Sequence, residues 1–148
     1  MNEKEVAGLV RKAIADLYSD GGSSSKQTEL TDMTLALARK IIARVEEKAN
    51  EMGVSVVTAV SNAAARPVAV ECMDDSYIAS YDVALKKAYT VVALKMPTTQ
   101  LKKLCQPGAS LYGLELTNGG KIVIFGGGVP LIHNGRIIGG LGVSGGSE

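Results

Sequence analysis

The chain has few side chains that could act as a nucleophile, a general base or a metal ligand. Among its 148 residues there is one histidine, His133, and there are two cysteines, Cys72 and Cys105. The sequence holds no H-x-x-x-H and no C-x-x-C pair, the spacings typical of metal sites. A serine or cysteine nucleophile would need His133 as its base, and nothing in the sequence places His133 beside one. Residue types and spacing therefore indicate no catalytic centre.

The stretch around the histidine, VPLIHNGRII, allows two interpretations. Asn134-Gly135 suits the two central positions of a type I′ turn, because both positions need positive φ. His133 would then end one strand, opposite Arg136, and bind nothing. Alternatively, its imidazole contacts a metal or a haem. We prefer the hairpin.

Two other segments could contact a ligand. GGGVP, residues 126–130, could present backbone N–H groups to an anion, although a β-bulge or a close backbone crossing is the simpler explanation. MDDS, residues 73–76, sets two carboxylates beside a thioether. Capping of the following helix by Asp75 or Ser76 explains that segment without a function.

Composition limits the classes of protein to which the chain can belong. Its length fits one domain, and 46% hydrophobic and 21% charged residues are typical of a folded one. A net charge of +1 without a basic block predicts no nucleic-acid partner. No apolar run reaches the ~18 residues of a membrane span, and charges spread through the N-terminus argue against a secretory signal. We expect a cytoplasmic protein with two free thiols.

The first residues predict an amphipathic helix, residues 1–18. Its apolar stripe repeats at helical spacing and consists of Val6, Leu9, Val10, Ala13, Ile14 and Leu17. Residues 19–28, rich in Gly and Ser, predict a flexible linker to the body of the protein, residues 29–148. A helix this short is marginal alone in water, so we expect its stripe to dock onto something.

The body predicts helices in the middle and strands at both ends. We expect a helix from Thr31 or Asp32 to about Glu51, strands at 54–60 and 67–73, a helix at 77–95, a short helix at 99–105 capped by Thr98, and strands at 121–126, 129–134 and 136–143. This order favours an α+β domain in which helices cover an antiparallel sheet.

Three segments of the body resemble one known family. They are ECMDDSYIASYDVALKKAYTVVALKMPT, then QPGASLYGLELTNGGKIVIFGGGVPL, then NGRIIGGLGVSGG. They contain a Met-Asp pair, an Asp-x-Ala-x-x-Lys-Ala-x-Thr helix, a Gly-Gly-x-Pro strand start and a closing Gly-Val-Ser-Gly. In this order they resemble the GlcG/HbpS family, which includes the C-terminal domain of PduO-type proteins. The resemblance implies a profilin-like fold, a five-stranded antiparallel sheet flanked by helices, in a homo-oligomer.

The resemblance also implies a cofactor, because some members of the family bind haem and the family is often labelled haem-degrading. The family motif falls on Met73, Asp74, Lys86, Thr90, Gly127 and Ser144, and with Tyr112 and Gly128 these are the candidate ligand-binding residues. The candidate axial ligands are His133, Met73 and Tyr112, with Tyr77 and the two cysteines as further donors.

The sequence departs from the family pattern at two places. The loop at residues 62–67 reads NAAARP instead of a DRGG-like turn, and the helix that normally follows VSGG is absent from this sequence. We expect the first helix or a neighbouring subunit to cover the sheet surface that this helix would cover.

The N-terminal helix and its Gly/Ser-rich linker are similar to the encapsulation peptides of bacterial microcompartment cargo. The resemblance therefore implies delivery into a microcompartment, with shell or cargo proteins as partners of residues 1–18. Packing on its own domain and self-association are the competing interpretations of that helix. Three functions follow as hypotheses: a haem or tetrapyrrole binder, an accessory protein without a small-molecule ligand, and a cobalamin- or haem-processing enzyme.

Overall fold

The computed structural model describes residues 3–19 and 30–146 of the chain. In chain order these residues form α1 (Glu3–Ser19), α2 (Leu35–Met52), β1 (Val57–Asn62), β2 (Pro67–Cys72), α3 (Ile78–Ala93), α4 (Thr98–Leu104), β3 (Gly128–His133) and β4 (Arg136–Ser144). Two 3₁₀ turns, Leu114–Leu116 and Asn118–Gly120, lie between α4 and β3. No described helix is long and apolar enough to cross a membrane.

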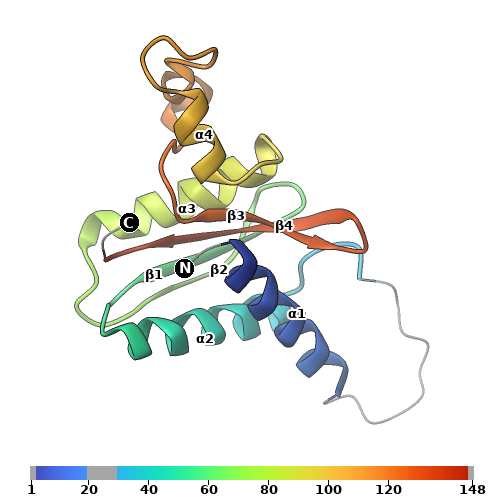
Figure 1. Cartoon of the computed structure of the whole chain (residues 1–148). Helices are drawn as coiled ribbons and strands as arrows, with labels where there is room; N and C mark the ends of the chain where they lie inside the picture. The colour runs from blue at the N-terminus through green and yellow to red at the C-terminus, as the bar shows by residue number, and fades with distance from the viewer. Residues whose placement is uncertain (1–2, 20–29, 147–148) are drawn as a thin grey trace.

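The four strands form one antiparallel sheet in the order β2-β1-β4-β3. In Figure 1 the helices α1 and α2 cover one face of this sheet, and α3 covers the other. The edge strands β2 and β3 each contain a proline, Pro67 and Pro130. The α+β class with an antiparallel sheet is therefore confirmed.

The prediction of five strands is wrong, because residues 121–126 form no strand. Ile122 and Val123 are buried, which explains the strand-like apolar pattern. Their backbone, however, bonds to a helix: Val123 N donates to Thr90 Oγ1 at 3.0 Å, and Thr90 Oγ1 donates to Lys121 O at 3.2 Å. A side chain of α3 thus takes the place of a neighbouring strand as hydrogen-bond partner.

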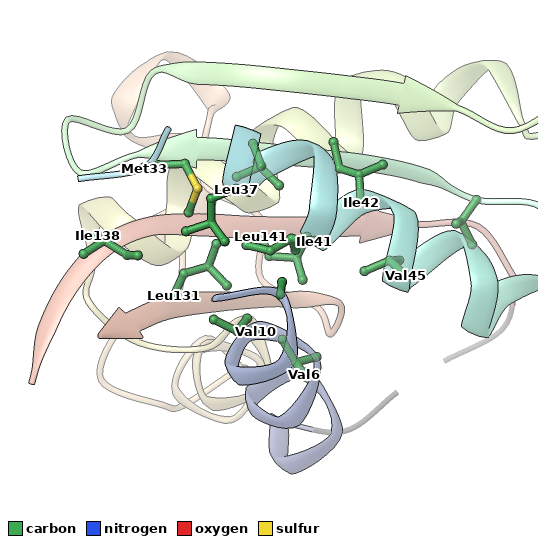
Figure 2. Packing of buried hydrophobic residues seen from close by; sticks show 14 of the residues in the cluster. Val6, Val10, Met33, Leu37, Ile41, Ile42, Val45, Leu131, Ile138 and Leu141 are labelled. Atoms are coloured by element: carbon green, nitrogen blue, oxygen red, sulfur yellow. The ribbon is translucent and has the colours of Figure 1, made fainter. Parts of the chain in front are cut away.

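The larger apolar core lies between the sheet and α2. Leu37, Ile41, Ile42 and Val45 of α2 are at most 1% exposed and pack with residues of β1, β3 and β4 (Figure 2). Their positions repeat every three or four residues, which sets them on one face of the helix. Burial of this face accounts for most of the apolar contact that holds α2 on the sheet.

On the opposite face, glycines let the backbone of α3 approach the sheet. A Cβ on Gly142 would lie 2.1 Å from Ala84 O, and one on Gly140 would lie 2.4 Å from Ala88 O. The facing residues of α3 are themselves small, Ala84 and Ala88, and both are buried. The closing glycine-rich segment therefore fixes how close α3 lies to β4.

Helix α1 packs against α2 and β3 of its own chain. Val6, Val10 and Ala13 are 6%, 4% and 0% exposed and belong to the same core as α2 (Figure 2). The other stripe residues pack around them half-buried: Leu9, Ile14 and Leu17. In this structure the predicted docking face of residues 1–18 is thus in contact with the body of the protein. The linker was predicted at residues 19–28, but Ser19 is the last residue of α1, and residues 20–29 lie outside the described residues.

Three predicted helix caps are wrong. Thr98 does not cap α4, because the N-cap residue there is Pro97 and Thr98 Oγ1 instead accepts from Gly128 N at 2.9 Å. The N-cap of α2 is Thr34, because its Oγ1 accepts from Leu37 N at 3.2 Å. The predicted caps, Thr31 and Asp32, do not have this role. Asp32 instead accepts from Met33 N and from Ala63 N, each at 2.8 Å, and so ties the loop before α2 to the β1–β2 turn.

At the start of α3 the N-cap residue is Tyr77, without a side-chain bond, so Asp75 and Ser76 are not caps. The hairpin is confirmed: His133 pairs with Arg136, and Asn134 and Gly135 have φ of 49° and 73°.

Candidate functional site

The predicted ligand-binding residues lie in three separate parts of the fold. Strand register brings Cys72 and Ser144 to the two sides of Val57, so Met73 and Ser144 lie at one end of the sheet. Gly128 pairs with Gly142 at the same end, next to Gly127. His133 lies at the opposite end, in the hairpin with Arg136.

Tyr112 belongs to neither end of the sheet. It is 67% exposed and lies in the segment after α4, which rises from the sheet on the side of α3 (Figure 1). Met73 is half-buried and packs against the core on the α2 side. The three candidate axial ligands therefore do not converge, and the described residues contain no group of three His, Cys, Asp or Glu side chains that could hold a metal ion.

A lysine that our sequence analysis missed lies at the centre of the first group. Lys87 is 4% exposed, and its Nζ donates to Val143 O at 2.9 Å. The same ammonium lies 4.8 Å from the centre of the Phe125 ring, a cation–π contact. The candidate Lys86 instead points outward and pairs with Asp82 at 2.8 Å. Counted from Asp82, the Asp-x-Ala-x-x-Lys spacing falls on Lys87, and this signal could have found it.

The glycines of GGGVP make room for this lysine. A Cβ on Gly127 would lie 2.7 Å from Lys87 Nζ, and one on Gly128 would lie 3.2 Å from Lys87 Cβ and 2.8 Å from Thr98 Cγ2. Gly127 has φ of +111°, a conformation that other residues rarely adopt. The interpretation of this segment as a close backbone approach is therefore confirmed.

Two other candidates have structural contacts in the described chain. Thr90 is fully buried, and its Oγ1 bonds to Lys86 O, Lys121 O and Val123 N. Ser144 Oγ donates to Ser80 Oγ at 3.1 Å, joining β4 to the first turn of α3. Asp74 is exposed in the loop before α3.

Apolar and aromatic side chains remain exposed at the start of α3. Tyr77, Ile78 and Tyr81 are 73%, 98% and 51% exposed, and Phe125, above Lys87, is 42% exposed. Ile78 and Tyr81 are spaced i, i+3 and are neighbours in the first turn of α3, where Tyr81 precedes the buried Ala84 by three residues and remains exposed. We call Tyr77, Ile78 and Tyr81 the outer face of α3. Side chains of this type can cover a flat apolar ligand.

The two thiols differ in accessibility. Cys105 is 3% exposed, and burial, followed by the nearby Glu115 carboxylate, raises the pKa of its thiol. Cys72 is exposed near the end of the edge strand β2. Since the thiolate is the reactive form, only Cys72 is suited to react in the folded protein.

We therefore expect a thiol-specific dye to label one cysteine of the native protein within minutes and the second only after unfolding. Mass spectrometry of the labelled peptides should place the fast label on Cys72. The Cys72→Ser variant should show no fast label. Rapid native labelling of Cys105 would contradict its burial.

These features of the fold define the class of protein as a small α+β domain. Its antiparallel sheet has helices on both faces, and glycines of β4 let α3 lie close to the sheet. Residues 33–148 match the family described as haem degrading protein HbpS-like, and the chain belongs to this family.

Three relatives illustrate the match. An uncharacterized 15.0 kDa protein from the dhaT-dhaS intergenic region of Citrobacter freundii is 46% identical over 83% of this chain and 87% of its own length. The crystal structure of Klebsiella pneumoniae protein ORFY is 41% identical with a TM-score of 0.78, over 85% of this chain and 87% of that one. The structure described as a PduOC:heme complex is 46% identical with a TM-score of 0.67, over 68% of this chain and 73% of that one.

A longer relative shares only part of its length. The corrinoid adenosyltransferase PduO of Salmonella typhimurium is 40% identical over 83% of this chain, but the match spans 37% of that protein. The chain therefore corresponds to about a third of the adenosyltransferase.

Proposed function

We propose that the protein binds haem or a related tetrapyrrole on the outer face of α3. The observation that carries this proposal is the exposed group of aromatic and apolar residues there, in a chain 46% identical to a protein whose structure is described as a haem complex. A tetrapyrrole needs an apolar surface for its ring, a donor for its metal and polar partners for its carboxylates.

The residues of this region fit those requirements. Ile78 and the rings of Tyr77 and Tyr81 offer apolar surface, and the two phenols are donors of a type that haem proteins use. Lys86 lies on the same helix with 35% of its side chain exposed and can attract a carboxylate. When bound, haem would supply an iron centre for ligand binding or redox chemistry. The residues of the chain would hold and orient the ring.

A haem titration followed by absorbance tests the proposal. We expect the Soret band of the wild-type protein to shift and to saturate near one haem per chain. The double variant Tyr77→Phe/Tyr81→Phe keeps both rings but loses both phenol oxygens, so we expect its affinity to fall about tenfold or more.

Tyr112→Phe is the matched control, because it makes the same change on the segment after α4, and it should bind as the wild type does. If only Tyr112→Phe, His133→Ala or Met73→Leu weakens binding, haem binds elsewhere than on α3. If the wild type shows no saturable shift, the protein is an accessory protein without this ligand.

We also propose that α1 delivers the protein into a bacterial microcompartment. Three observations support this: α1 is amphipathic, it precedes the family-matched residues 33–148, and two relatives are named PduO. A fluorescent protein fused to residues 1–20 should gather at shells, and diffuse fluorescence would refute delivery. The exposed outer face of α3 further supports a homo-oligomer, because a second copy could cover the other side of a bound ring.

A further inference from the structure

Helix α1 contacts its own chain through the same residues that would bind a partner. The buried residues Val6, Val10 and Ala13 follow the i, i+4, i+7 spacing of the stripe. In Figure 2, Val6 and Val10 lie beside Ile41, Val45 and Leu131. We call this region of α2 and β3 the seat of α1. A helix presents its apolar stripe in one direction, so α1 cannot contact its seat and an outside groove at once.

One ion pair marks the outer border of the seat. Arg44 Nη2 of α2 lies 2.6 Å from Asp16 Oδ2 of α1. The hydrogen bond and charge of Arg44 lower the pKa of Asp16, and Asp16 in turn raises the pKa of Arg44. Both side chains are partly exposed, so the contact can break without leaving a buried charge.

We propose that the seat competes with the partner for α1, so that the docking face is covered until a partner displaces the seat. The inference rests on the proposed delivery by α1. It also defines the chemistry of the partner, which must offer an apolar groove that accepts a helix stripe of Val and Ala at i, i+4, i+7. The apparent affinity for such a groove is the intrinsic affinity multiplied by the fraction of molecules with α1 released.

Two variants of the full chain separate this competition from a simple loss of structure. Arg44→Glu weakens the seat from the α2 side and leaves the sequence of α1 intact. Val10→Asp also weakens the seat, but it damages the stripe itself. Lys48→Glu is the matched control: it makes the same kind of charge change one turn further along α2, where Lys48 pairs with Glu51 of the same helix.

The test measures two quantities for each variant: hydrogen exchange of the α1 amides and co-sedimentation with purified empty microcompartment shells. For Arg44→Glu we expect faster exchange and up to about fivefold more protein bound to shells. Val10→Asp should show faster exchange and less binding than the wild type. Lys48→Glu should match the wild type in both quantities.

Other outcomes overturn the inference in distinguishable ways. If Arg44→Glu leaves the exchange of the α1 amides unchanged but still raises binding to shells, release of α1 from its seat does not control docking. If Arg44→Glu releases α1 but binds shells no better, while Val10→Asp binds less, α1 delivers the protein without competition from the seat. If no variant binds shells and the fusion of residues 1–20 stays diffuse, the delivery proposal itself fails.

Discussion

The Gly142→Ala variant is expected to lose about 3 kcal/mol of folding free energy, because the new methyl group has no space. Its Cβ would lie 2.1 Å from Ala84 O and 2.7 Å from Ala88 N, both backbone atoms of α3. Neither atom can move without shifting the helix away from β4. Chemical denaturation should show the lower stability, and thermal unfolding should show a Tm lower by about 10 °C.

Gly8→Ala is the matched control, since a Cβ at Gly8 in α1 meets no atom within 4 Å. Alanine favours a helix over glycine by about 1 kcal/mol, so this variant should keep or raise the stability. If Gly142→Ala unfolded at the wild-type midpoint, the close contact between α3 and β4 would not exist as described.

The second large effect is expected from Lys87→Met, which keeps a long side chain but removes the ammonium group. Val143 O would lose its donor, and the Phe125 ring would lose its cation. We expect a loss of about 2 kcal/mol, the range for a hydrogen bond to a charged group together with a cation–π contact. Denaturant titration measures the loss, and hydrogen exchange should rise at residues 125–128.

The neighbouring lysine provides the comparison. Lys86→Met removes the same charge from an exposed i, i+4 pair with Asp82, so we expect a change of only about 0.5 kcal/mol or less. Equal effects of the two substitutions would contradict the central position of Lys87.

Local pattern was sufficient for most helices and for the hairpin. The stripes in α1 and α2 follow the helical period, and Asn134-Gly135 determines its turn through positive φ. The strand expected at residues 121–126 was wrong because apolar alternation reports burial and not the hydrogen-bond partner. There the partner is Thr90, thirty-three residues away from Val123 in the chain.

The candidate site was harder to predict, because its main features depend on contacts between distant segments. Lys87 and Lys86 are adjacent in sequence, yet the first is buried under Phe125 and the second faces outward. Ser80, the partner of Ser144, carried no motif of its own. Packing of α1 on its own domain was only one of the competing interpretations, because amphipathicity indicates that a helix face is buried but not which surface covers it.

The two edge strands of the sheet affect how readily molecules associate at high protein concentration. An edge strand with unpaired backbone groups can recruit a strand from a neighbouring molecule, and chains joined in this way polymerise. Here β2 begins with Pro67 and β3 contains Pro130. A proline has no N–H that it could donate to an added strand. A proline in each edge strand therefore disfavours edge-to-edge pairing between molecules.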